Sequence, residues 1–151
     1  MSAHLAHPHP KRKHNRPIIL FVTLCTSTRG QWLANEPFHG AFREAAALAH
    51  HWSIGRYVIM PDHVHLMCRP AVEEPLSIKK WSTFLRSAIS KLDGKSKSWR
   101  WQPDVWDTQM RDREHYGKKL AYMEANPLRA ELVENSVDWP FQGTLHDFVW
   151  L

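Results

Sequence analysis

Residues 53–69 read SIGRYVIMPDHVHLMCR, and this stretch decides the fold. Two runs rich in β-branched and apolar residues flank Pro61-Asp62, a pair that favours a tight turn. We therefore predict two antiparallel strands, 53–60 and 63–69, joined as a hairpin. Side chains two residues apart on a strand point to the same face. His63 and His65 thus share one face, and the other face, which helices would cover, receives Val64, Leu66 and Cys68.

The segments around this hairpin alternate between strand and helix patterns. A buried strand is predicted for residues 18–26 and a short strand for 105–110, and amphipathic helices are predicted for stretches starting at Pro37, Pro75 and Asp112. Asn126-Pro127 is expected to end the last helix, because the residue before a proline avoids helical backbone angles, with a short helix restarting at 128–133. The order strand, helix, two strands, helix, strand, helix predicts an α/β sandwich with helices on one face of the sheet.

Length and composition limit the classes of function. The chain has 151 residues, enough for one sizeable core, and its formal net charge of +5 favours a polyanionic partner. No apolar run reaches the roughly 18 residues of a membrane span, so we expect a cytoplasmic protein without a membrane partner. Two cysteines cannot make a disulfide scaffold. Residues 1–16 are expected to be a flexible basic arm rich in histidine and proline.

The His63-Val64-His65 triplet is the first candidate site, because two imidazoles on one strand face can share a metal ion. The strand alternation keeps Cys68 off that face, which argues against a zinc site made of these three side chains. Mg²⁺ and Mn²⁺ normally take oxygen ligands as well, so the ligand types leave the identity of the metal open. Histidine pairs on strands also occur without any catalytic role.

The second candidate pair lies on the predicted last helix. Tyr122 and Asn126 are four residues apart and so share a helix face. Tyrosine supplies an oxygen nucleophile, and asparagine supplies a carbonyl oxygen suited to a hard cation. Since tyrosine ionises near pH 10, attack on a phosphate needs a nearby cation or base. Tyr116, six residues earlier, is the alternative nucleophile.

A third group of residues is basic. Lysine and arginine side chains can contact the phosphates of a nucleic-acid backbone, although each could equally be part of a solvated helix or loop. The candidates for DNA binding in this group are Lys79, Lys80, Arg86, Lys91 and Arg100.

Two segments resemble a known family. Residues 57–66, YVIMPDHVHL, resemble the HUH signature block of the small single-tyrosine transposases. Residues 122–133, YMEANPLRAELV, resemble the segment that carries the nucleophilic tyrosine in the branch associated with repetitive extragenic palindromes (REP), and Trp139-Pro140 also fits that branch. One departure is Glu131, where relatives usually have glycine, which puts a local turn in doubt.

The resemblance implies a ferredoxin-like (RRM-like) sandwich. Its central antiparallel sheet would have helices packed on one face and a catalytic helix near the C-terminal half. Residues 17–151 would form a single HUH transposase-like catalytic domain.

The resemblance also implies a chemistry. His63, His65 and the amide of Asn126 would bind Mg²⁺ or Mn²⁺, with no nucleotide cofactor. Tyr122 would attack single-stranded DNA near a REP-like hairpin and form a 5′-phosphotyrosine intermediate. Arg129, in the same segment, is added to the DNA-binding candidates.

Three functions remain open at this point. The first is a metal-dependent DNA nickase and strand transferase that acts through Tyr122. The second is a domesticated protein that binds hairpin DNA without cleaving it. The third is a metal-dependent phosphodiesterase that uses water on a small substrate and leaves Tyr122 and Asn126 unused. The first two functions predict a nucleoid-associated protein, and both a monomer and a homodimer are compatible with the sequence.

Overall fold

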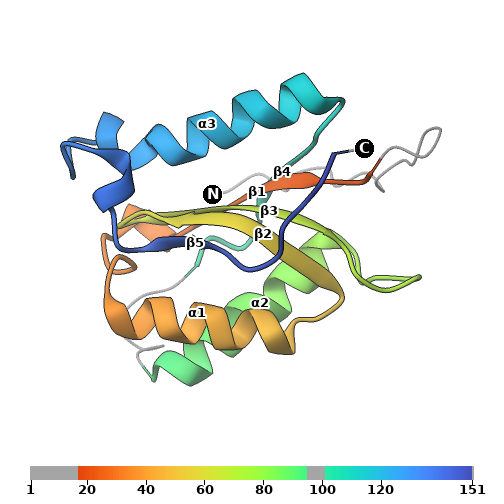
Figure 1. Ribbon diagram of the computed structural model, residues 1–151. Helices are drawn as coiled ribbons and strands as arrows, with labels where there is room; N and C mark the ends of the chain where they lie inside the picture. Colours follow the sequence, from red (N-terminus) through yellow and green to blue (C-terminus); the bar gives the residue numbers. More distant parts are fainter. Residues whose placement is uncertain (1–16, 95–100, 151) are drawn as a thin grey trace.

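A five-stranded antiparallel sheet forms the middle of the protein (Figure 1). The computed structural model describes residues 17–94 and 101–150, so the expected arm, 1–16, and Arg100 lie outside the described residues. The strands lie in the order β4-β1-β3-β2-β5. Their bounds are β1 Leu20–Cys25, β2 Trp52–Ile59, β3 His63–Pro70, β4 Trp106–Gln109 and β5 Gln142–Thr144.

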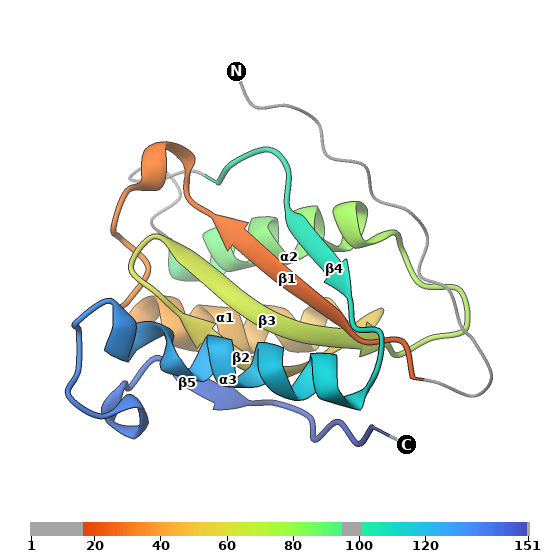
Figure 2. The same ribbon diagram turned by 90° about the horizontal axis from the view of Figure 1, so that it is seen from above.

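Helices cover both faces of this sheet unequally. Figures 1 and 2 show α1 and α2 side by side on one face, with α3 alone across the other. The helices are α1 Glu36–Leu48, α2 Ile78–Asp93 and α3 Arg113–Arg129, with short 3-10 turns at η1 Ser27–Arg29 and η2 Ser136–Asp138. This arrangement confirms the predicted α/β sandwich, but the chain order predicted helices on one face only, whereas α3 covers the second face. Among the residues that the structure describes, no helix is long and apolar enough to cross a membrane.

The predicted hairpin is confirmed as β2 and β3. The two strands pair antiparallel, and the Met60 N–H donates to the His63 carbonyl across the turn at 2.7 Å. Val64, Leu66 and Cys68 are fully buried in the core that β3 shares with α1 and α2. The alternation of β3 therefore turns His63 and His65 together to the other face, as the sequence predicted, and α3 covers that face.

The helices α1 and α2 lie on the face of the sheet opposite α3, and a side chain caps the first turn of each. The Asn35 side chain accepts from the Phe38 N–H at the start of α1, and Ser77 accepts from the Lys80 N–H at the start of α2. The second helix therefore begins at Ile78, later than the predicted start at Pro75, because the Ser77 hydroxyl satisfies one of its first free N–H groups.

The third helix is longer than predicted. It runs without a break from Arg113 to Arg129, so the expected end at Asn126-Pro127 and the separate helix over 128–133 were wrong. Pro127 removes one helical N–H donor, but it lies near the end of the helix and is buried there, which offsets that loss. The turn that follows contains Glu131 at φ 60°, a left-handed conformation that favours the glycine usual in relatives.

Candidate active site

The two histidines of β3 face each other beneath α3. Their Nε2 atoms are 3.1 Å apart, and their ring centroids are separated by 4.5 Å. His65 is buried, and the His63 side chain is only 13% exposed. Two ring nitrogens thus converge on one point in a largely dry setting.

A hydrogen bond to the Nδ1 atom orients each of the two imidazole rings. His63 Nδ1 is 2.6 Å from Asp62 Oδ1, and His65 Nδ1 is 2.8 Å from the hydroxyl of Thr23, its neighbour across the β1–β3 pair. A carboxylate accepts only, so His63 carries its proton on Nδ1 and leaves a lone pair on Nε2. The Thr23 hydroxyl can donate or accept, and so it suits either tautomer of His65. Metal-binding histidines are typically oriented by such partners.

The environment keeps both imidazoles neutral, the form that can ligate a metal. Burial, then the neighbouring basic groups of His63, Lys119, Arg129 and Arg29, lowers the pKa of His65 to about 3. Burial also lowers the pKa of His63. Against the effect of burial, hydrogen bonds from Arg29 and His63 hold the pKa of Asp62 below its usual value, so this carboxylate stays ionised.

Tyr122 projects from α3 toward the histidine pair. Its ring centroid lies 6.0 Å from that of His65, and the side chain is 44% exposed, so it is open to a large substrate. The Arg129 guanidinium lies over the Tyr122 ring at 4.1 Å, and Lys119 Nζ lies 5.2 Å from the ring centroid. Both cations are placed to attract a phosphate beside the phenol.

Asn126 lies one helical turn beyond Tyr122 and is half-buried. Within residues 17–94 and 101–150, no group of three or more His, Cys, Asp or Glu side chains could hold a metal. Two facing imidazoles fit a cation that takes further oxygen ligands, and the Asn126 amide, one turn beyond Tyr122 on α3, carries an oxygen of that kind. The donor set fits Mg²⁺ or Mn²⁺ without choosing between them.

The alternative nucleophile, Tyr116, has a different setting. Its side chain is buried, and its ring stacks on Trp150 with centroids 5.9 Å apart. Burial raises the pKa of its hydroxyl. Tyr116 therefore serves as packing between α3 and the C-terminal segment.

The expected DNA-binding residues are divided between the two faces of the molecule. Arg129 lies beside Tyr122, whereas Lys79, Lys80 and Lys91 lie on α2, on the opposite face of the sheet. Arg86 does not fit the expectation that it faces DNA. It is buried, and its guanidinium donates to the main-chain oxygens of Gln102 and Ser82.

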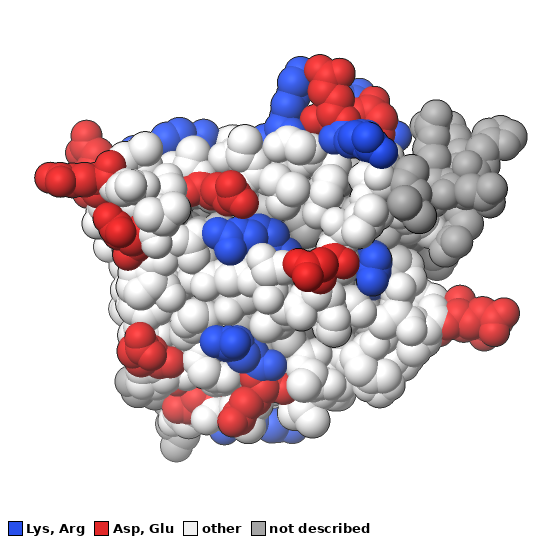
Figure 3. Space-filling view, in the orientation of Figure 1, with Lys and Arg blue, Asp and Glu red and all other residues white. Residues whose placement is uncertain are grey.

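The charges do not form a single patch on the face drawn in Figure 3. Basic and acidic side chains are interspersed there, and both signs occur around α3 at the top of the view. The net charge of +5 therefore does not by itself outline a DNA path on this face.

Sequence reasoning missed three side chains at the site. Lys119 precedes Tyr122 by three residues on the same helix, so helical spacing could have revealed it. Thr23 lies 42 residues before His65 and becomes its neighbour through strand pairing, and Arg29 lies 34 residues before His63 and reaches it from the turn after β1. Arg29 donates to Asp62 at 2.8 Å from the 3-10 turn η1, where Thr28 and Arg29 both have positive φ.

The fold is similar to that of solved structures described as transposases. A solved structure of a REP-associated tyrosine transposase bound to a REP hairpin matches with a TM-score of 0.69, over 95% of this chain and 96% of that chain, at 18% identity. A crystal structure from Deinococcus radiodurans, provisionally described as a transposase, matches with a TM-score of 0.54 over 78% of this chain and 96% of that chain, at 17% identity.

The amino-acid sequence is also similar to that of a curated protein. The REP-associated tyrosine transposase of Escherichia coli is 26% identical over 96 residues, which are 63% of this chain and 55% of the relative. The chain thus spans about half the length of this curated relative, and no family model matches it. In sequence and in fold, the protein is similar to the REP-associated tyrosine transposases.

Proposed function

We propose that the protein is a metal-dependent DNA nickase and strand transferase that uses Tyr122 as its nucleophile. One observation carries the proposal: the Tyr122 ring faces the buried histidine pair, 6.0 Å from the ring of His65, while remaining accessible from outside. A nucleophile and a site suited to a cation therefore lie within reach of one phosphate group. Neither a purely structural tyrosine nor a small-molecule phosphodiesterase would need this arrangement.

The reaction is a transesterification. The Tyr122 oxygen attacks phosphorus, and the bond from phosphorus to the 3′ oxygen of the preceding nucleotide breaks. The tyrosine proton is lost to solvent, and the departing 3′ oxygen takes a proton from solvent. The strand is then joined to the protein through a 5′-phosphotyrosine. The new ester retains the free energy of the broken bond, so a 3′-hydroxyl can reverse the step without ATP.

The surrounding side chains prepare this step. Arg129 and Lys119 flank the Tyr122 ring and would draw a backbone phosphate toward it. Asp62 and Thr23 orient the two imidazoles. His63, His65 and the Asn126 amide would hold Mg²⁺ or Mn²⁺, which when bound offsets the negative charge that builds on the phosphate oxygens.

The substrate we propose is single-stranded DNA beside a hairpin. Support comes from the similarity to a transposase whose structure was solved with a REP hairpin. Such a substrate places the protein with the nucleoid in the cytoplasm. The half-exposed Tyr122 suits a strand that arrives unpaired, because no duplex has to be opened first.

Covalent capture tests the proposal. The protein is incubated with Mn²⁺ or Mg²⁺ and labelled hairpin DNA carrying single-stranded flanks, and the products are separated on a denaturing gel. We expect a labelled band at the combined mass of protein and DNA. The band should disappear in Tyr122→Phe and persist in Tyr116→Phe, which serves as the matched control.

Two outcomes contradict the proposal. An adduct that persists in Tyr122→Phe would move the nucleophile elsewhere. Hairpin binding without an adduct under either metal would instead identify a domesticated binding protein.

A further inference from the structure

The 3-10 turn η1 holds an arginine against the histidine pair. This turn follows β1 and lies beside the turn between β2 and β3 (Figure 2). Arg29, its last residue, donates from Nε to Asp62 Oδ2 at 2.8 Å, and its Nη2 lies 3.4 Å from His63 Nδ1. The Arg29 side chain is nevertheless 53% exposed. Its guanidinium therefore lies at the edge of the candidate active site and is open to a ligand.

Two consecutive residues of η1 have left-handed backbone angles without being glycine. Thr28 has φ 59° and Arg29 has φ 58°. Such angles are rare for a β-branched residue, and strain of this kind persists only where the surrounding structure fixes it. Here the Thr26 N–H donates to the Asp62 carbonyl at 3.0 Å, and the buried Thr26 hydroxyl donates to the Gly30 carbonyl at 2.9 Å. Strained backbone gathers at functional sites, so this turn indicates a role for Arg29 beyond packing.

The two outer nitrogens of Arg29, Nη1 and Nη2, have no strong acceptor in the part of the chain that the structure describes. His63 Nδ1 carries a proton that it donates to Asp62, so it cannot accept from Nη2. Nη1 lies 3.5 Å from the Cys25 sulfur, and a thiol is a weak acceptor. The bond from Nε to Asp62 fixes the plane of the guanidinium. The outer nitrogens are therefore a preoriented pair of donors.

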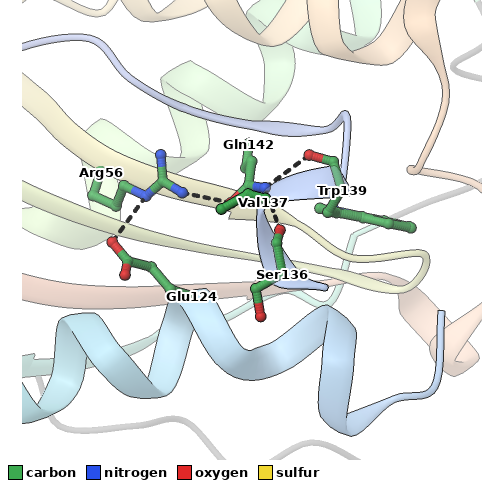
Figure 4. Close-up of a pocket in the computed structure, with 6 residues that line it drawn as sticks. All are labelled: Arg56, Glu124, Ser136, Val137, Trp139 and Gln142. Atoms are coloured by element: carbon green, nitrogen blue, oxygen red, sulfur yellow. Dashed lines mark hydrogen bonds and ion pairs between the residues drawn. The ribbon is translucent and has the colours of Figure 1, made fainter. Parts of the chain in front are cut away.

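Arg56, which reaches Glu124 on α3, shows the opposite case (Figure 4). Its Nε lies 3.4 Å from Glu124 Oε1, and its Nη2 donates to Gln142 Oε1. Groups of the protein itself thus engage this guanidinium on both sides. Its side chain is 23% exposed, less than half the 53% of Arg29. Of these two arginines, Arg29 is therefore the one that a ligand can reach.

A phosphate of the DNA strand suits the donors of Arg29. A guanidinium can donate two parallel N–H bonds to a phosphate, which makes arginine well matched to that group. Asp62 offsets part of the charge, but its two oxygens already accept from Arg29 and His63. Lys119 and Arg129 add two further positive charges beside the candidate nucleophile. The site as a whole therefore attracts an anion.

The place of Arg29 relative to His63 decides which phosphate it would contact. His63 Nε2 faces His65 Nε2 at 3.1 Å, where the cation and the attacked phosphate would lie, whereas Arg29 lies at the Nδ1 edge of the same ring. One imidazole ring separates the two positions. Consecutive phosphates of a strand are joined through one sugar, so a strand with one phosphate at Nε2 can present the next one to Arg29.

We propose that Arg29 binds the backbone phosphate next to the one that Tyr122 attacks. The assignment rests on the proposed function for the strand and its path but not on the cleavage chemistry. Lys119 and Arg129 would hold the attacked phosphate, and Arg29 would hold its neighbour. Two fixed phosphates set the position of the strand along the histidine pair, so Arg29 would determine which ester bond meets the nucleophile.

Binding without cleavage tests this contact. Tyr122→Phe protein in EDTA is titrated with labelled hairpin DNA carrying single-stranded flanks, and fluorescence anisotropy gives the affinity at several salt concentrations. Adding Arg29→Gln should make the plot of log affinity against log salt less steep by about 0.7, as expected for one phosphate contact on a single strand. Arg43→Gln is the matched control. Arg43 is exposed on α1, across the sheet from α3, so this variant should leave the slope unchanged.

A scan with uncharged phosphates locates the contact. Each phosphate of the flanks is replaced in turn by a methylphosphonate, and the attacked position is read from the adduct of the parent protein. Tyr122→Phe protein should lose about tenfold in affinity at one position beside the attacked phosphate. Protein that also carries Arg29→Gln should lose nothing there. Arg29→Lys keeps the charge without the planar pair of donors, so it should retain the salt slope and show only part of the tenfold loss.

The outcomes separate this proposal from the nickase proposal. An unchanged salt slope in Arg29→Gln, or equal losses with and without Arg29→Gln at every position of the scan, refutes the contact and leaves the Tyr122 adduct test untouched. Weaker Mn²⁺ binding with an unchanged slope would show that Arg29 acts only by holding Asp62, which also refutes the contact. A coupled position without any adduct would keep the phosphate contact and refute the nickase.

Discussion

Thr23→Val should lower the stability of the protein and weaken the binding of a metal ion by the histidine pair, while leaving the sheet intact. Valine has nearly the shape of threonine and suits a strand, so the change removes little more than the hydroxyl 2.8 Å from His65 Nδ1. His65 is only 6% exposed, so water has little access to replace the lost partner. A buried polar group left without a hydrogen bond costs about 1–3 kcal/mol.

These contacts give the expected size of the loss of thermal stability and of the loss of metal affinity. For a chain of this length, each kcal/mol lowers the midpoint of thermal unfolding by about 2–4 °C, so Tm should fall by roughly 2–12 °C. Loss of an outer partner of a metal-binding histidine typically weakens metal binding by about 10–100-fold. Thr23→Val should therefore bind Mn²⁺ more weakly by that factor.

Two measurements check this prediction. Thermal melts in EDTA report the stability of the metal-free protein, and titration calorimetry with Mn²⁺ reports the affinity. Thr108→Val, on the exposed side of the edge strand β4, is the matched control and should change neither quantity. If Thr23→Val binds Mn²⁺ as tightly as the parent and melts at the same temperature, the role assigned to Thr23 is refuted.

Two further variants test the turn after α3 and the burial of a histidine in α1. Glu131→Gly should raise the free energy of unfolding by about 0.5–1 kcal/mol, because glycine adopts the left-handed angle without strain, whereas Glu134→Gly should lower it; equal shifts in a denaturant titration would contradict the turn geometry. Burial, then the charge of Arg43, lowers the pKa of His39, so the folded protein binds fewer protons than the unfolded chain below about pH 6.5 and loses stability as the pH falls. His39→Gln should therefore lose less unfolding free energy than the parent between about pH 7 and pH 5, and parallel losses would show that His39 does not contribute.

The elements that were predicted correctly are those whose pattern is local. The alternation across 53–69 is a property of the extended chain itself, so it placed His63 and His65 opposite Val64 and Leu66 before any packing was known. The turn at Pro61-Asp62 is equally local, because those two residues suit a tight turn in any context. These local features were sufficient to predict the hairpin and the shared face of the two histidines.

The errors arose where tertiary packing outweighs a local preference. A proline usually ends a helix, yet burial of the Pro127 ring lets α3 continue to Arg129. The place of Arg86 on a basic helix suggests a side chain that faces solvent, yet Arg86 is buried and donates to the Gln102 carbonyl. Contacts between segments that are distant in the sequence decide both outcomes, and a local pattern does not report such contacts.

The sequence by itself determined the hairpin, the sharing of a face by the histidines, and the presence of Tyr122 and Asn126 one turn apart, because strand and helix periodicity act over a few residues. Only the tertiary structure decided that Thr23 holds the imidazole of His65, that Arg29 reaches Asp62, and that Tyr122 faces His65. These contacts join residues from different strands and helices. They form only when the buried apolar faces bring those elements together, and no spacing along the chain encodes them directly.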